Sequence, residues 1–109
     1  MAKRQPKRSE RTLRREGERA TTRLQEDRER LFALEPGGRV ERPIEAISAA
    51  VIEAHATSVP CPRCGGGLEV VEHTALVQQG VRLRETKLRC RRCGSGRSLW
   101  FKIVGNNPN

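Results

Sequence analysis

At 109 residues, with 35% hydrophobic and only 3% aromatic residues, the chain has room for one small domain and extensions, and it excludes a large core. The formal net charge of +9 favours acidic partners such as nucleic acid. No apolar run approaches the roughly 20 residues that cross a membrane. The charged first residues carry no secretory signal, so we expect a soluble, cytoplasmic protein.

The first eight residues carry four positive charges, no negative charge and no apolar periodicity. Such a composition predicts a disordered basic tail over residues 1–8. The tail is interpreted either as an arm that lies along phosphates or as a solvated terminus.

Residues 9–35 are predicted to form a charged helix, with Ser9 as its N-cap and a stop at Pro36-Gly37-Gly38. A heptad rhythm of alternating steps of four and three runs along it, interrupted by one glycine and one aspartate, at Leu13, Gly17, Ala20, Leu24, Asp27, Leu31 and Leu34. The helix is either a self-associating coiled coil or a single helix that docks through Leu31, Phe32 and Leu34. The short, broken pattern favours the single helix.

Residues 36–59 are predicted to hold a linker followed by a short helix or strand. Ile44, Ile47, Val51 and Ala54 fit a helical stripe, and Pro43 is allowed in a first helical turn. The alternation of Ile44, Ala46, Ala50 and Ile52 fits a strand equally well.

All four cysteines lie in two C-x-x-C-G motifs, Cys61-Pro-Arg-Cys64-Gly65 and Cys90-Arg-Arg-Cys93-Gly94. A tight turn between paired cysteines aims both sulfurs at one point, and a following glycine takes the positive φ that such a turn needs. Four thiolates are a tetrahedral set that zinc prefers, and they leave no open position for water. We therefore predict one structural Zn²⁺ held by Cys61, Cys64, Cys90 and Cys93.

Three other chemistries use the same cysteines. Disulfides are disfavoured without a secretory signal. A thioredoxin-like centre would need one C-x-x-C in a βαβ setting, which the pattern lacks. Iron in a rubredoxin-like site has the same ligand set and stays open as an alternative. His55 and His73 are interpreted as surface or packed histidines, because four cysteines already complete the shell.

The 25 residues between the two motifs predict a hairpin. Leu68–Val77 alternates as a strand, Gln78-Gln79-Gly80 is typical of a turn, and Val81–Arg89 is the returning strand. Its alternation changes phase at Leu88, which predicts a bulge near Glu85-Thr86. A third strand is predicted at Arg97–Val104, with Leu99, Phe101 and Ile103 on one face, followed by a frayed end at 105–109.

The two C-x-x-C-G turns resemble those of zinc ribbons, and the whole chain resembles small uncharacterised bacterial proteins with a basic N-terminal helix ahead of such a ribbon. The resemblance covers residues 60–104. It implies a small α+β fold in which a three-stranded antiparallel zinc ribbon follows the charged helix, and it also suggests an extra strand beside the ribbon. Ribbons serve nucleic-acid binding, protein docking or structure alone, so the resemblance indicates fold more than function.

The motifs favour a non-catalytic binding protein, since no catalytic set can be assembled from them. Weakly specific nucleic-acid binding, in transcription or a related process, is the first hypothesis. Its predicted contacts are basic residues and one aromatic around the second knuckle and the strands: Arg82, Arg84, Arg89, Arg91, Arg92, Arg97, Trp100 and Lys102. These arginines alternatively pair with Glu69, Glu72 and Glu85 across strands.

Two alternatives belong to other classes. One is a protein-docking module that uses the N-terminal helix or an exposed Trp100 or Phe101. The other is a redox centre built on the thiols or on iron.

Overall fold

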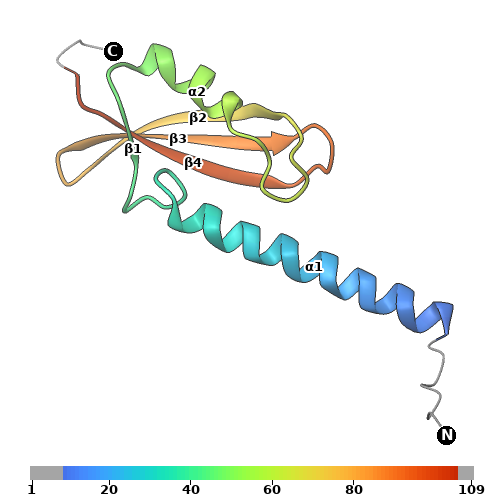
Figure 1. Ribbon diagram of the computed structural model, residues 1–109. Helices are drawn as coiled ribbons and strands as arrows, with labels where there is room; N and C mark the ends of the chain where they lie inside the picture. Colours follow the sequence, from blue (N-terminus) through green and yellow to red (C-terminus); the bar gives the residue numbers. More distant parts are fainter. Residues whose placement is uncertain (1–8, 106–109) are drawn as a thin grey trace, which may run out of the picture.

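The computed structural model describes residues 9–105 and shows a long helix that projects from a small sheet domain (Figure 1). Two α-helices are present, α1 (Glu10–Leu34) and α2 (Ile52–Ser58), and a single 3₁₀ turn at Ala49–Val51 leads into α2. The four strands are β1 (Ile44–Ala46), β2 (Leu68–Gln78), β3 (Val81–Cys90) and β4 (Gly96–Ile103). The tails predicted at 1–8 and beyond Gly105 lie outside the described residues. Within 9–105, neither helix combines the length and apolarity that a membrane crossing requires.

The strands form one mixed sheet in the order β1-β4-β3-β2. β2, β3 and β4 pair antiparallel, as predicted, but β1 joins the free edge of β4 in parallel. The prediction of a three-stranded antiparallel sheet is corrected accordingly. Ile44 and Ala46 lie opposite Phe101 and Ile103, so the alternation seen in the sequence is that of a strand.

Residues 41–59 contain both elements that the sequence left open. The strand comes first, and the helix begins only after Ser48. The predicted helical stripe is wrong, because Ile47 is 68% exposed and Val51 and Ala54 also face outward. Ile52 and Ala56 are instead buried, and they pack α2 onto one face of the sheet.

The hairpin turn is confirmed, since Gln78 pairs with Val81 and both Gln79 (φ 53°) and Gly80 (φ 78°) have positive φ. The predicted bulge is wrong in position. β3 pairs regularly with β4 throughout, and the register shift lies in β2, between Val70 and Glu72. The alternation in β3 changes phase because Leu83 is buried on one face of the sheet, whereas Thr86 and Leu88 are buried on the other.

α1 begins as predicted, with the Thr12 amide donating to the Ser9 hydroxyl at 3.1 Å. Only one of its three predicted docking residues reaches the domain. Phe32 packs against the core, whereas Leu31 and Leu34 are 60% and 53% exposed. Every residue from Glu10 to Leu24 is exposed, so the first four turns of α1 project free of the domain.

Candidate metal centre

The two C-x-x-C-G turns fold in the same way and face each other across the end of the sheet that β3 and β4 share. In each turn, the glycine amide donates to the carbonyl of the first cysteine, from Gly65 to Cys61 at 2.7 Å and from Gly94 to Cys90 at 3.0 Å. Both glycines have φ of 76°, as the sequence predicted. The Arg91 amide donates to the Gly67 carbonyl at 2.9 Å and so ties the two turns together.

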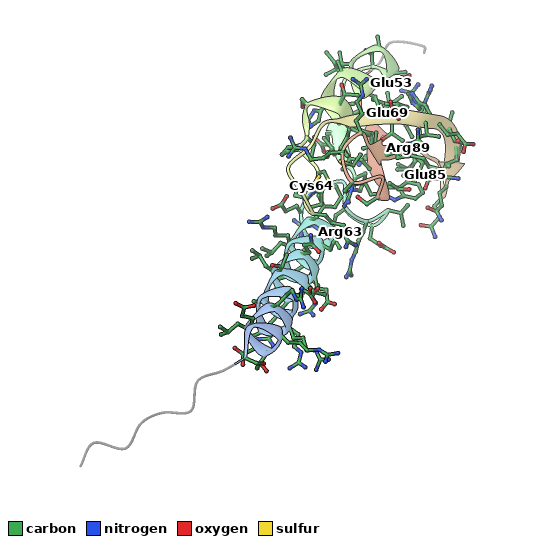
Figure 2. All side chains as sticks on the ribbon, turned by 90° about the vertical axis from the view of Figure 1, so that its right-hand side faces the viewer. Glu53, Arg63, Cys64, Glu69, Glu85 and Arg89 are labelled. Atoms are coloured by element: carbon green, nitrogen blue, oxygen red, sulfur yellow. The ribbon has the colours of Figure 1, made fainter. Side chains whose placement is uncertain are left out.

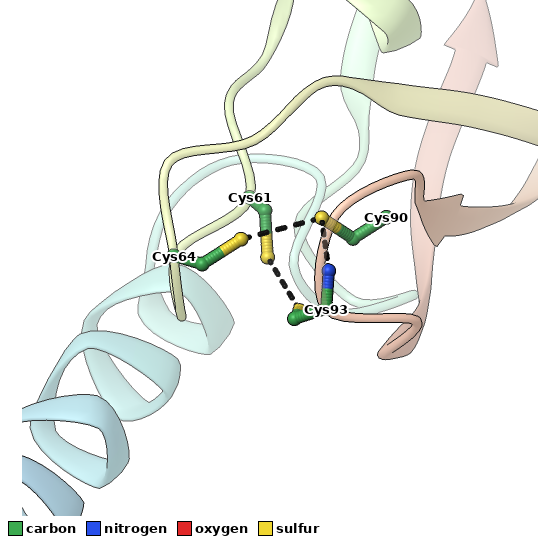
Figure 3. A group of neighbouring side chains, drawn as sticks. All are labelled: Cys61, Cys64, Cys90 and Cys93. Atoms are coloured by element: carbon green, nitrogen blue, oxygen red, sulfur yellow. Dashed lines mark hydrogen bonds between the residues drawn. The ribbon is translucent and has the colours of Figure 1, made fainter.

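The four sulfurs converge on one point (Figure 3), and all lie within 4.8 Å of one another. The Cys61 and Cys93 sulfurs are 3.7 Å apart, and those of Cys64 and Cys90 are 3.3 Å apart. A tetrahedron with metal–sulfur distances of about 2.3 Å has edges of about 3.8 Å. The separations therefore match a tetrathiolate site and exceed the roughly 2.05 Å of a disulfide bond.

Backbone amides and a missing side chain shape the cradle around the sulfurs. The amides of Gly66 and Arg92 donate to the Cys64 and Cys90 sulfurs, each at 3.3 Å. A Cβ at Gly66 would stand 3.0 Å from the Cys90 sulfur and 3.2 Å from the Cys64 sulfur. Only glycine lets the chain pass so close to the cluster, and its amide supplies the donor that a thiolate needs.

The environment separates the thiol pKa values. Burial would raise the pKa of Cys61, but hydrogen bonds from the Ser95 hydroxyl and from the backbone of Cys64 and Arg63 outweigh it and lower the pKa to about 6. The Gly66 amide works to lower the pKa of Cys64, yet the contact with Cys90 prevails together with desolvation and raises it to about 11. Hydrogen bonds from Ser95 lower the pKa of Cys93. The Ser95 hydroxyl and the backbone donors therefore favour the thiolate form of Cys61.

Arg97 links this cluster to α1. Its guanidinium forms a two-pronged ion pair with Glu29, at 2.8 and 2.9 Å, and it also donates to the Ser95 hydroxyl at 2.9 Å and to the Cys61 sulfur at 3.6 Å. The side chain is only 5% exposed and lies over the Phe32 ring, 5.3 Å from its centre. Burial would lower the pKa of Arg97, but the Glu29 contact prevails and raises it. Arg97 thus connects the Cys61 sulfur and the Ser95 hydroxyl to Glu29 on the projecting helix.

Arg97 is therefore removed from the predicted nucleic-acid contacts. Its guanidinium is buried and already holds a carboxylate in the geometry that a phosphate would need. Sequence reasoning missed Glu29, because its pairing with Arg97 joins residues 68 positions apart. It also missed Ser95, whose hydroxyl contacts the Cys61 and Cys93 sulfurs. The only sequence signal was a hydroxyl placed two residues after the second cysteine pair.

The remaining predicted contacts do not form one open basic surface. Arg89 and Arg91 share Glu69, at 3.1 and 3.4 Å, and Lys87 pairs with Glu72 at 3.4 Å. Figure 2 shows Arg89 beside Glu69 on the sheet. The alternative of arginine pairs across strands therefore holds for Arg89 with Glu69, whereas Glu72 pairs with Lys87 and Glu85 accepts from Ser98.

The other five predicted contacts are spread around the domain. Arg82 donates to the Gly105 carbonyl and Arg92 to the Cys64 carbonyl. Arg84 is half-buried and faces the side of the sheet that α2 covers, whereas Trp100 and Lys102 are half-buried on the opposite side. Phe101, named as a docking anchor, is fully buried.

Neither histidine belongs to the cluster. The Nδ1 atom of His73 lies 3.0 Å from a Glu53 carboxylate oxygen, and the His55 ring stacks edge-on against Phe101 at 5.5 Å. Among the described residues, the four cysteines are the one cluster of side chains that could hold a metal ion.

Comparison with known proteins adds no family assignment. The chain matches no protein-family model, no curated protein and no solved structure. The four clustered cysteines are compatible with a zinc ribbon, and the geometry of the site carries the functional argument alone.

Proposed function

We propose that the chain is a non-catalytic binding protein whose sheet domain is stabilised by one structural Zn²⁺. The convergence of the four sulfurs within 4.8 Å carries this proposal. Cys61, Cys64, Cys90 and Cys93 would hold the ion, which supplies folding free energy rather than reactivity, because four protein ligands leave no position for water. Two of the cysteines are buried and the cradle admits no side chain at Gly66, as suits a closed site.

Metal content tests the first part of the proposal. Elemental mass spectrometry of protein expressed without added metal should give one zinc per chain, with no thiol reacting until a chelator is added. Iron, seen as visible colour, would favour the redox alternative, and a metal-free folded protein would exclude the structural site. Cys64→Ala should abolish amide dispersion in NMR spectra, whereas Val77→Ala, a truncation on the exposed end of β2, should preserve it.

The ligand class that fits the charge is the phosphate backbone of nucleic acid. Support comes from the net charge of +9, the sequence pI of about 10.7 and the excess of arginine over lysine. Such binding is weakly specific and falls steeply with added salt. An affinity for duplex or single-stranded nucleic acid that does not change with salt would contradict it.

Protein docking through α1 is a second candidate, favoured by one observation. Leu13, Leu24 and Leu31 follow one side of α1 and are each at least half exposed. Sedimentation across a wide concentration range tests self-association, and Leu24→Gln should weaken any dimer. Monomers at all concentrations would set this candidate aside in its self-associating form.

A further inference from the structure

Arginine gathers on α1 in a way that the metal centre does not explain. Arg11, Arg15, Arg19 and Arg23 recur every fourth residue along the part of the helix that projects from the domain. At 3.6 residues per turn, each is offset by about 40° from the last, so the four occupy a sector of about 120°. With a rise of 1.5 Å per residue, they extend over about 18 Å. We call these four residues the arginine stripe.

Within residues 9–105, the stripe makes no ion pair or hydrogen bond to another side chain. None of its four guanidinium groups makes an ion pair or hydrogen bond with another residue in the described part of the chain, and all four are exposed. Glu16 and Glu18 border the sector on either side. The first acidic residue inside it is Glu26, which already pairs with Arg30 at 4.0 Å. The positive charge of the stripe is therefore available to an external anion.

The helix that carries the stripe is also held in place. Gln25 accepts from Arg63 at 3.4 Å, Glu29 pairs with the buried Arg97, and Phe32 packs into the core. These three contacts lie C-terminal to the stripe, and α1 points away from the sheet there (Figure 1). A helix about 10–12 Å across, whose residues 10–24 are all exposed in the described part of the chain, fits the major groove of B-form DNA, which is about 12 Å wide.

We propose that the arginine stripe on α1, and not the strands around the second knuckle, is the surface that binds nucleic acid, and that its ligand is duplex DNA. The helix lies in the major groove, and the guanidinium groups contact phosphates along its walls. This inference rests on the proposed nucleic-acid function and names the site for it. Duplex RNA is a poor ligand, because its major groove is deep and too narrow for a helix.

The test uses the full, metal-loaded chain and a labelled DNA duplex of about 20 base pairs, with binding measured by fluorescence anisotropy between about 50 and 200 mM salt. R15Q/R19Q removes two stripe charges. R14Q/R28Q removes two charges from the other side of the same helix and is the matched control. Glutamine and arginine have similar helix propensities, so circular dichroism should show equal helicity in all three proteins.

The stripe variant should lose two phosphate contacts. The slope of log K against log salt should then fall by about 1.8, and affinity at about 50 mM salt should fall by about 100-fold. The control should keep the wild-type slope. Equal losses in both variants would overturn the stripe in favour of net charge, and an unchanged R15Q/R19Q would place binding elsewhere while leaving the nucleic-acid function intact.

Two further outcomes separate this inference from the function on which it rests. Wild-type protein that binds no nucleic acid at any salt concentration contradicts the nucleic-acid function itself. If duplex RNA binds as tightly as DNA, the groove assignment alone is overturned. If anionic lipid vesicles bind in place of DNA, the ligand class is overturned.

Discussion

At the scale of single residues, the ion pair of the buried Arg97 with the partly exposed Glu29 differs from the pairs on the sheet surface. The Arg97 side chain is 5% exposed, whereas Arg89, which pairs with Glu69, is 62% exposed. Water screens the exposed pair and solvates its charges when the pair is broken, whereas the Arg97 guanidinium has little access to water. The same chemistry therefore has different energetic consequences at the two sites.

We expect Arg97→Ala to lower the free energy of unfolding by about 2–3 kcal/mol, since it removes a buried guanidinium that hydrogen-bonds to Glu29, Ser95 and Cys61. Arg89→Ala should change it by less than about 1 kcal/mol. Denaturant unfolding of the metal-bound protein measures both. Comparable losses in the two variants would show that Arg97 is no more important than a surface residue.

Protons compete with a metal ion for the four cysteine sulfurs, because the thiolate and not the thiol is the ligand. Within the cluster, hydrogen bonds from Ser95 and from the backbone outweigh burial, lower the pKa of Cys61 and so favour its thiolate form. We predict that acid releases the metal and unfolds the sheet together, as monitored with a chelating dye and circular dichroism. A metal content that does not change as the pH falls would contradict ligation by thiolates.

At the scale of secondary-structure elements, Gly17 is a weak point of α1 with no packing role. A Cβ at this position would meet nothing within 4 Å, and α1 carries no contact there that needs glycine. Gly17→Ala should therefore stabilise the helix by up to about 1 kcal/mol. Amide hydrogen exchange across residues 13–21 should slow by up to about fivefold.

Gly38→Ala is the matched control for this substitution. A Cβ at Gly38 would collide with the backbone of Phe32 and Ala33, where α1 joins the domain, so this variant should lose stability. Faster exchange in Gly17→Ala would show that α1 needs the flexibility of glycine.

The elements that the sequence predicted best are those fixed by local chemistry. Ser9 and the Pro36-Gly37-Gly38 stop set the ends of α1, and Gln79-Gly80 sets the hairpin, because caps and positive φ depend on neighbouring residues alone. Each C-x-x-C-G turn is local in the same way, whereas the meeting of the two pairs depends on the hairpin of β2 and β3 between them.

The features that sequence reasoning left open or missed depend on tertiary contacts. β1 is a strand of three residues, too short for periodicity to separate from a helix, and it exists because β4 offers it an edge. The bulge predicted in β3 is wrong because the change of alternation there reflects which face of the sheet is buried at each end of the strand. The register shift lies instead in β2. The pairing of Arg97 with Glu29 joins residues 68 positions apart, which no local pattern encodes.

At the scale of the whole molecule, the cysteine cluster and the position of α1 depend on each other. The first cysteine pair leads into β2, and the second pair ends β3 and begins the return to β4. Arg97 then carries the connection from the Cys61 sulfur to Glu29 on α1. Cys61 and Cys90 also belong to the buried core, so their sulfurs help to close it.

This arrangement predicts the effect of metal removal. The core is small for an independent fold, and a structural zinc supplies about 10–16 kcal/mol of apparent folding free energy. A chelator should therefore unfold the sheet cooperatively, and added zinc should restore it. Because Arg97 loses its support when the cluster opens, residues 25–34 of α1 should lose exchange protection together with the strands. Chelator saturated with zinc is the control, and sheet signals that survive in the metal-free protein, or a C-terminal half of α1 that stays protected after the strands have melted, would contradict the coupling.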